Sequence, residues 1–238
     1  MKTQNFLKRG GELLMIIIGV FIALVANAWW EDRSDQRLAD DYRGRLVGEL
    51  TRNKGLIDTL ELHTSRILTA SDSLLPFFEP DIIPGSQSRV VVNAYNATRR
   101  WGETFDRATF DDLMSTGNIR LLPDNDLRTA LTDFYGAAKL FPRDWYGVEY
   151  RDLVRHIIPA DIQLGIRECP EVTSPAWNDC PLTVEPSRAR AIVQQLAADR
   201  AVVGAFRVQI HELAIFRRDL MRLNARLDST LTILRRKS

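Results

Sequence analysis

Few residues of this chain have the types and spacing that catalysis or metal binding requires. The histidines are the first candidates to consider. His211 and Glu212 are adjacent, as in the His-Glu-x-x-His signature of zinc peptidases, whose second histidine falls four residues after the first. Position 215 is Ile215, so that second zinc ligand is absent. His63 and His156 are isolated in the sequence and predict no metal site. We interpret His211 and Glu212 as an exposed polar pair on a helix.

Paired carboxylates occur at two places and could serve general acid-base catalysis. They are Asp111-Asp112 and Asp124-Asn125-Asp126, each at the predicted start of a helix. The helix dipole stabilises carboxylates at that end, so both pairs have a structural explanation. The sequence contains no Gly-x-Ser-x-Gly motif, no glycine-rich phosphate loop and no calcium-loop spacing. We therefore predict a protein that is not an enzyme and that uses no metal or cofactor.

The two cysteines, Cys169 and Cys180, lie in the proline-rich stretch RECPEVTSPAWNDCPL. Their spacing does not suit a Cys-x-x-Cys redox pair, and no histidine lies beside them to complete a zinc site. In an oxidising compartment, two thiols this close in sequence predict one structural disulfide. Closing so short a loop stabilises the fold by about 2–3 kcal/mol in the chain-entropy model. Two free thiols would instead argue against export.

The strongest physical signal is the stretch LLMIIIGVFIALVANAWW, from Leu13 to Trp30. It carries no charge between Leu13 and Ala26. At about 1.5 Å per residue a helix over this stretch is roughly 27 Å long, close to the roughly 30 Å of a bilayer's hydrocarbon core. Trp29 and Trp30 have the amphipathic rings that favour the headgroup level. The stretch predicts one transmembrane helix over 13–30, with both tryptophans at the membrane interface.

Charges on either side of this stretch predict its orientation. Residues 1–12 are net basic, whereas acidic residues slightly outnumber arginines over 31–45. Because Lys and Arg near a span stay in the cytoplasm, we expect 1–12 to be cytoplasmic and 31–238 to be periplasmic, on a bacterial inner membrane. The competing interpretation is a secretory signal peptide cleaved after Ala28. The tandem tryptophans and the helical sequence that follows favour a retained single-pass signal-anchor, and both interpretations export the chain.

Small residues four apart, Gly19 and Ala23, form a stripe within the predicted span. Such a stripe lets a second membrane helix approach closely, which would fit a homo-oligomer or an envelope protein partner. Ordinary membrane-helix composition explains the same two residues.

The remaining sequence is helical in pattern. Apolar residues recur at spacings of three, four and seven over 31–75, which predicts a long helix that continues the span. We expect shorter helices over 90–158, a cysteine loop over 165–186 and a long C-terminal helix over 187–236. The two long helices would measure roughly 67 and 75 Å, matched lengths that suit an antiparallel pair. The predicted fold is all-α, a transmembrane helix continuing into a bundle-like domain outside the cytoplasm.

The last helix carries a coiled-coil-like seam of apolar residues seven apart, namely Phe206, Leu213, Leu220, Leu227 and Leu234. A helix of the same chain or a second copy could pack on this seam. If the helix returns along the first one, its basic end, 235–237, would lie beside Trp29 and Trp30 and touch anionic headgroups. The alternative is that these charges only complement the helix C-terminus.

An aromatic cluster in the middle of the chain could line a ligand groove between helices or fill a small core. We interpret it as core; its members are Phe134, Tyr135, Phe141, Trp145, Tyr146 and Tyr150.

Two stretches carry a resemblance to a known family. GELLMIIIGVFIALVANAWWED, from Gly11 to Asp32, resembles the opening of a family of bacterial single-pass membrane proteins of unknown function. TFDDLMSTGNIRLLPDNDLRTALTDFY, from Thr109 to Tyr135, is similar to that family's helix-link-helix in mid-chain. The resemblance fades through the cysteine loop. It implies a topology and no activity.

Taken together, these features favour an interaction or scaffold module of the cell envelope. The formal net charge of +1 gives no reason to expect nucleic acid as a partner, which leaves the lipid bilayer, an envelope protein or a second copy. The alternative is a ligand-sensing helical bundle. With so short a cytoplasmic segment, such a sensor would have to signal through a partner in the membrane.

Overall fold

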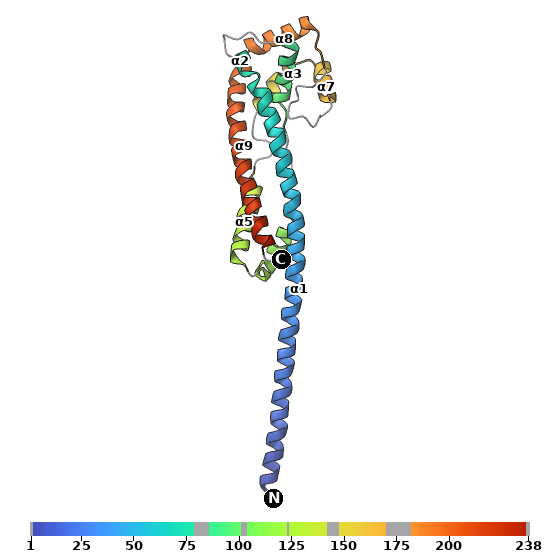
Figure 1. Cartoon of the computed structure of the whole chain (residues 1–238), viewed down its shortest axis with the longest axis vertical. Helices are drawn as coiled ribbons and strands as arrows, with labels where there is room; N and C mark the ends of the chain where they lie inside the picture. The colour runs from blue at the N-terminus through green and yellow to red at the C-terminus, as the bar shows by residue number, and fades with distance from the viewer. Residues whose placement is uncertain are drawn as a thin grey trace.

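The computed structural model describes residues 2–78, 86–100, 104–122, 124–141, 148–169 and 182–236, with side chains from Met15 onward except Ile16. Within these ranges every regular element is a helix, which confirms the predicted all-α class. Figure 1 shows an elongated molecule in which one helix projects alone at the N-terminal end and the other elements gather along its second half.

The projecting helix, α1 (Lys2–Asp72), runs without a break from the apolar stretch into the helical domain, as the sequence predicts. The apolar side chains that are described between Met15 and Leu38 are exposed, and Ala39 is the first buried one among them and the residues that follow. We call residues 15–38 the stalk. Among the residues whose side chains are described, no helix combines the length and the apolarity that crossing a membrane requires.

The helix α9 (Arg200–Arg235) lies antiparallel to the second half of α1 (Figure 1), as the matched lengths predict. All five residues of its seam are buried, and the partner helices belong to the same chain. The single helix expected over 187–236 is wrong, because α8 (Pro186–Ala198) ends before Asp199. The Asp199 carboxylate accepts hydrogen bonds from the amides of Ala201 and Val202 and thereby caps α9 as a separate helix.

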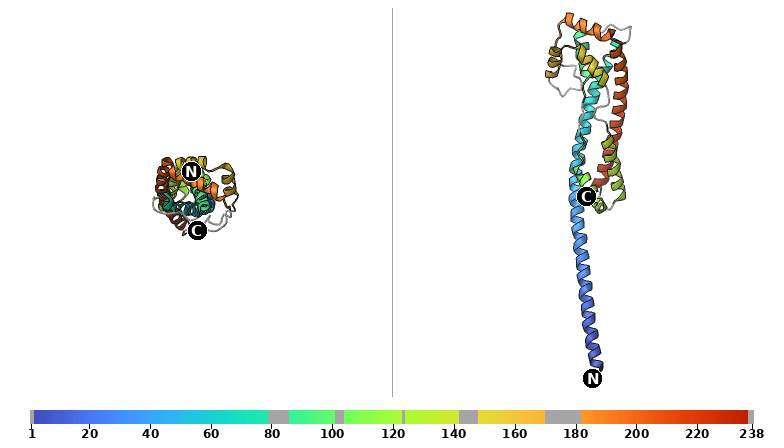
Figure 2. Two further views of the ribbon diagram at one scale, coloured as in Figure 1. Left: turned by 90° about the horizontal axis from the view of Figure 1, so that it is seen from above. Right: turned by 180° about the vertical axis from the view of Figure 1, so that it is seen from behind.

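The end of α9 does not reach the two tryptophans of the stalk. Leu234 packs in the same apolar cluster as Tyr42, and Figure 2 places the C-terminus beside the middle of α1. Arg235 and Arg236 therefore lie next to the domain, which corrects the expectation that they reach Trp29 and Trp30; Lys237 lies outside the described residues.

Short helices complete the domain: α2 (Leu75–Phe78), α3 (Gln87–Ala97), α4 (Ala108–Ser115), the 3-10 helix η1 (Asn118–Leu121), α5 (Asn125–Leu140), α6 (Val148–Ile157) and α7 (Ala160–Glu168). Gly117 ends α4 with a φ of 72°, a left-handed conformation that glycine adopts without strain. Asp124 caps α5 by accepting a hydrogen bond from the amide of Asp126.

The domain has two apolar clusters along the α1–α9 pair. The near lobe, beside the stalk, joins α4, η1 and α5 to the two long helices. The far lobe joins α3, α6, α7 and α8 to the end of α1 and the start of α9. Phe134 and Tyr135 are buried in the near lobe and Tyr150 in the far lobe, so these aromatic residues are core, as predicted. Trp145 and Tyr146 lie outside the described residues.

Candidate functional site

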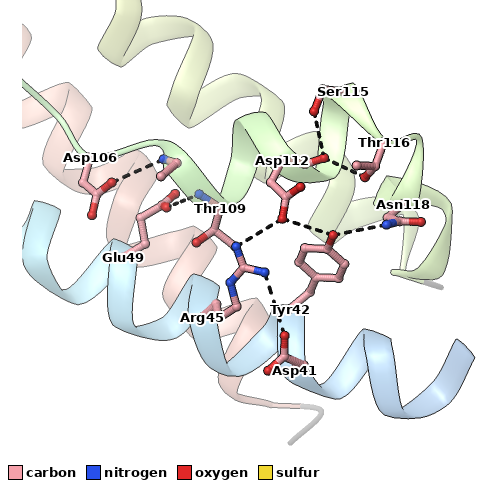
Figure 3. A network of polar contacts seen from close by, with 11 residues as sticks. Asp41, Tyr42, Arg45, Glu49, Asp106, Thr109, Asp112, Ser115, Thr116 and Asn118 are labelled. Atoms are coloured by element: carbon pink, nitrogen blue, oxygen red, sulfur yellow. Dashed lines mark hydrogen bonds and ion pairs between the residues drawn. The ribbon is translucent and has the colours of Figure 1, made fainter. Parts of the chain in front are cut away.

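A carboxylate, that of Glu49, is fully enclosed in the near lobe, on the face of α1 that meets α4 and α5. One carboxylate oxygen accepts a hydrogen bond from the hydroxyl of Tyr135 on α5. The other accepts one from the backbone amide of Thr109 in the first turn of α4, at 2.5 Å. Figure 3 shows this contact with Thr109. Both oxygens are therefore occupied, which is what a buried carboxylate requires.

Tyr135 is held as a hydrogen-bond donor. Burial and the neighbouring Glu49 carboxylate raise the pKa of its phenol far above the ordinary value. The ring also stacks on Phe110, with 4.3 Å between ring centroids, so α4 and α5 meet over the carboxylate. The raised pKa keeps the hydroxyl a hydrogen-bond donor to the Glu49 carboxylate.

A second set of contacts fixes the segment just before α4. The side chain of Asn53 on α1 donates to the carbonyl oxygen of Asp106 at 2.7 Å and accepts from its amide at 2.8 Å. The guanidinium of Arg52 forms an ion pair with the Asp106 carboxylate at 2.6 Å, and this hydrogen bond lowers the pKa of Asp106 below its ordinary value. The segment before α4 is not helical, so the backbone groups of Asp106 have no partner within a helix. The Asn53 side chain supplies that partner.

Asp112 holds the stalk-side end of α4 against α1. Its carboxylate accepts hydrogen bonds from the hydroxyl of Tyr42 at 3.2 Å and from Arg45 at 3.1 Å. Asn118 in η1 donates to the same Tyr42 hydroxyl at 3.1 Å, so one phenol bridges two short elements (Figure 3). We call these contacts, centred on Tyr42, Glu49 and Asn53, the α1 latch.

The latch binds one part of the chain to another and offers little room for a ligand. The cavity next to Tyr135 measures about 110 Å³, whereas ligand sites typically measure roughly 300–1,000 Å³. The larger hollow, about 590 Å³, is an open groove between α1 and α9. Its lining is mainly apolar and also includes Asp72, Arg217, Arg218 and Arg222.

The histidines and paired carboxylates that the sequence suggested for metal binding or catalysis are dispersed in the fold. His63 is buried on α1, whereas His156 on α6 and His211 on α9 are exposed. Asp111 pairs with Arg107, and within the described ranges no histidine, cysteine and carboxylate side chains gather into a metal-binding group. Of the pair interpreted as exposed, His211 is exposed and Glu212 is partly buried.

The other predicted residues lie apart from the latch. Cys169, at the end of α7, is disulfide-bonded, and Cys180 lies outside the described residues, so their pairing stays a prediction. Trp29, Trp30, Gly19 and Ala23 are exposed on α1. A Cβ atom added to Gly19 would meet nothing within 4 Å, so this stripe is uncovered in the single chain.

Sequence reasoning missed Glu49 and Asn53. Both occupy core positions of the helical repeat, because Glu49 follows Tyr42 by two turns and Asn53 follows Glu49 by one. A polar residue at an apolar position of a repeat was the available signal. Comparison with other proteins adds no name to this site: no protein-family model, curated protein or solved structure matches the chain.

Proposed function

We propose that this protein is a membrane-anchored, non-enzymatic interaction module of the bacterial cell envelope. Residues 1–12 lie in the cytoplasm, α1 crosses the inner membrane once over 13–30, and the two lobes stand in the periplasm. There they contact other envelope components, either a protein partner or a second copy of the chain.

The observation that carries the proposal is the exposure of the described apolar side chains in the first part of the stalk, 15–28, around the whole helix. Met15 is 73% exposed and Phe21 66%, and the neighbouring isoleucines, leucine and valines are also exposed. A helix that is apolar all round belongs in a lipid or protein interior, because water cannot stabilise it. The proposed span also includes Leu13, Leu14 and Ile16, whose side chains lie outside the described residues.

The unbroken backbone of α1 explains how an anchored domain would be held. The same helix that leaves the apolar stretch enters the near lobe, where the α1 latch fixes α4 and α5 to it. No flexible linker separates anchor and domain along α1. The lobes would therefore stand at a fixed height and orientation above the lipid, which suits a spacer or scaffold.

Membrane fractionation of the full chain tests the anchor. We expect the protein to float with membranes and to resist carbonate extraction. Replacing Ile22 and Val25 with arginine should release it, since each buried Arg opposes insertion by about 2.5–3.5 kcal/mol. The matched control is Leu62→Arg, at an exposed apolar residue of the domain, which should stay in the membrane. A full-length chain found in the soluble fraction would refute the proposal.

Crosslinking in cells tests the interaction. A photoreactive residue at Asp133 on the exposed face of α5 should capture an envelope protein or a second copy of the chain. The same residue at Lys139, also exposed, provides a second position on the same helix. A product that is absent at both positions in native membranes would contradict a scaffold role for the near lobe.

The groove between α1 and α9 favours the second candidate, a ligand sensor. We expect a ligand of this groove to raise the Tm of the wild-type chain and to lose that effect in Met221→Trp, because the indole would fill the groove. Met114→Trp, at an exposed methionine of α4, is the control and should keep the effect.

A further inference from the structure

A small pocket lies on α1 where the apolar stretch ends. Its volume is about 90 Å³, and it is lined by Trp29, Trp30, Arg33, Ser34 and Arg37. One helix supplies the whole lining, because residues three, four and seven apart share a face. Two indole N–H groups, two guanidiniums and one hydroxyl therefore meet on a segment roughly 12 Å long.

This face points away from the domain. Trp30, Arg33 and Arg37 precede Ala39, Tyr42 and Leu46 by nine residues each, which is about two and a half helical turns, or half a rotation around the axis. The later three side chains are buried against the lobes. The pocket therefore lies on the opposite side of α1, where neither lobe covers it.

The two guanidiniums of the pocket are available for a ligand. Arg33 and Arg37 make no ion pair or hydrogen bond with any described residue, and both are exposed. Farther along α1, Arg43 pairs with Asp40 and Arg45 with Asp112. The acidic residues of the same segment occupy the other face of the helix; they are Glu31, Asp32 and Asp35. The charge of the stalk is thus sorted into a basic aromatic face and an acidic face.

We propose that this pocket binds the phosphate of an anionic phospholipid in the leaflet that faces the lobes. The proposal rests on the membrane anchoring proposed above, since anchoring places Trp29 and Trp30 at the headgroup level. Guanidiniums match phosphate geometry with paired N–H donors, and the Ser34 hydroxyl and indole N–H groups add neutral donors. A lipid held on one face only would also fix the rotation of α1 about its axis, and therefore the direction in which the lobes point.

Quenching of tryptophan fluorescence by brominated lipids tests the pocket. The full chain is reconstituted in phosphatidylcholine vesicles that contain equal small fractions of brominated phosphatidylglycerol or brominated phosphatidylcholine. We expect stronger quenching by the anionic lipid. Arg33→Gln with Arg37→Gln should lower that preference by about five-fold for each arginine removed. Arg43→Gln, which removes a paired arginine from another face, is the matched control and should keep the preference.

The outcomes separate the two proposals. Equal quenching by the two lipids, or a preference that survives in the double variant, would overturn the lipid site while the anchor stands. Absence of quenching by either lipid would overturn the anchor and the site together. A preference that disappears in the presence of inorganic phosphate would assign the pocket to a soluble anion and refute the lipid.

Discussion

The near and far lobes are built on the same two helices but are held to α1 by different sets of contacts. In the near lobe, α1 contributes buried polar side chains that bind three separate segments, through Tyr42, Glu49 and Asn53. In the far lobe the apolar cluster includes Ala70 of α1 and Leu74 just after it, and the buried Asn93 of α3 donates a hydrogen bond to the Ser73 hydroxyl beyond the end of α1. The small helices of the far lobe pack on one another; in addition α3 packs on α1, α6 and α8 pack on α9, and α7 ends beside a disulfide-bonded cysteine.

Because their contacts differ, the two lobes also differ in which interactions with α1 must break before each lobe can change its position along this helix. Apolar contacts are not directional, whereas a hydrogen bond fixes the positions of its donor and its acceptor. A buried carboxylate that loses its donors is strongly destabilising, so the near lobe can change its position on α1 only by breaking the latch. The latch therefore fixes the position of α4 and of Tyr135 along α1.

Large-to-small substitutions in the two cores should produce the largest effects. Phe134→Ala in the near lobe and Phe206→Ala in the far lobe each remove a fully buried ring and should lower the free energy of unfolding by about 3–5 kcal/mol. Hydrogen exchange should show faster opening of α5 in the first variant and of α6 in the second. Leu140→Ala, at an exposed residue, is the control. Equal loss of protection in both lobes would show that they unfold as one unit.

Reduction of the disulfide should destabilise the far lobe alone. Removing the crosslink of Cys169 with its predicted partner Cys180 should lower stability by about 2–3 kcal/mol, the value for a short closed loop. We expect faster hydrogen exchange in α7 and α8 under reductant and unchanged protection in α4 and α5. A change confined to the near lobe would contradict the division of the domain into two lobes.

Two buried tyrosines allow the lobes to be compared at one hydroxyl each. Tyr135→Phe removes a donor from the Glu49 carboxylate and should lower the free energy of unfolding by about 2 kcal/mol. Tyr150→Phe removes a long contact of 3.4 Å to the carbonyl oxygen of Ala94, and we expect a loss of about 0.5 kcal/mol. Denaturant unfolding measures both. If both variants lost the same free energy of unfolding, the Glu49 carboxylate would add nothing to the stability of the near lobe.

The sequence predicts the long elements of this fold and leaves its buried polar contacts undetermined. Apolar residues at helical spacing identify α1 and the seam of α9, because a long periodic face needs a long partner. Gly117 and Asp124 mark the ends of helices by local chemistry that a sequence displays directly. Asp199 offered the same capping signal, and the unbroken run of helix-forming residues on both sides concealed it.

The latch could not be predicted because its partners are far apart in the chain. Glu49 meets Thr109 and Tyr135, and Asn53 meets Asp106, at separations that only the folded topology establishes. The stalk pocket is the opposite case. Its residues lie within nine positions on one helix, so their shared face follows from helical geometry. That Arg33 and Arg37 make no ion pair with a described residue could be seen only in the structure.

The smallest expected effect concerns the start of α8 in the far lobe, where Glu185 caps the helix. Hydrogen bonds from the hydroxyl and amide of Ser187 and the amide of Arg188 lower the pKa of the Glu185 carboxyl from 4.5 to about 2. Because the pKa in the folded chain is depressed, the cap contributes fully above pH 4.5 and is lost as the pH falls through about 2. Exchange of the Ser187 and Arg188 amides should therefore increase over this interval relative to its intrinsic rate. In Glu185→Gln the pH dependence should disappear, whereas a carboxyl that titrates near 4.5 would show that the cap does not form.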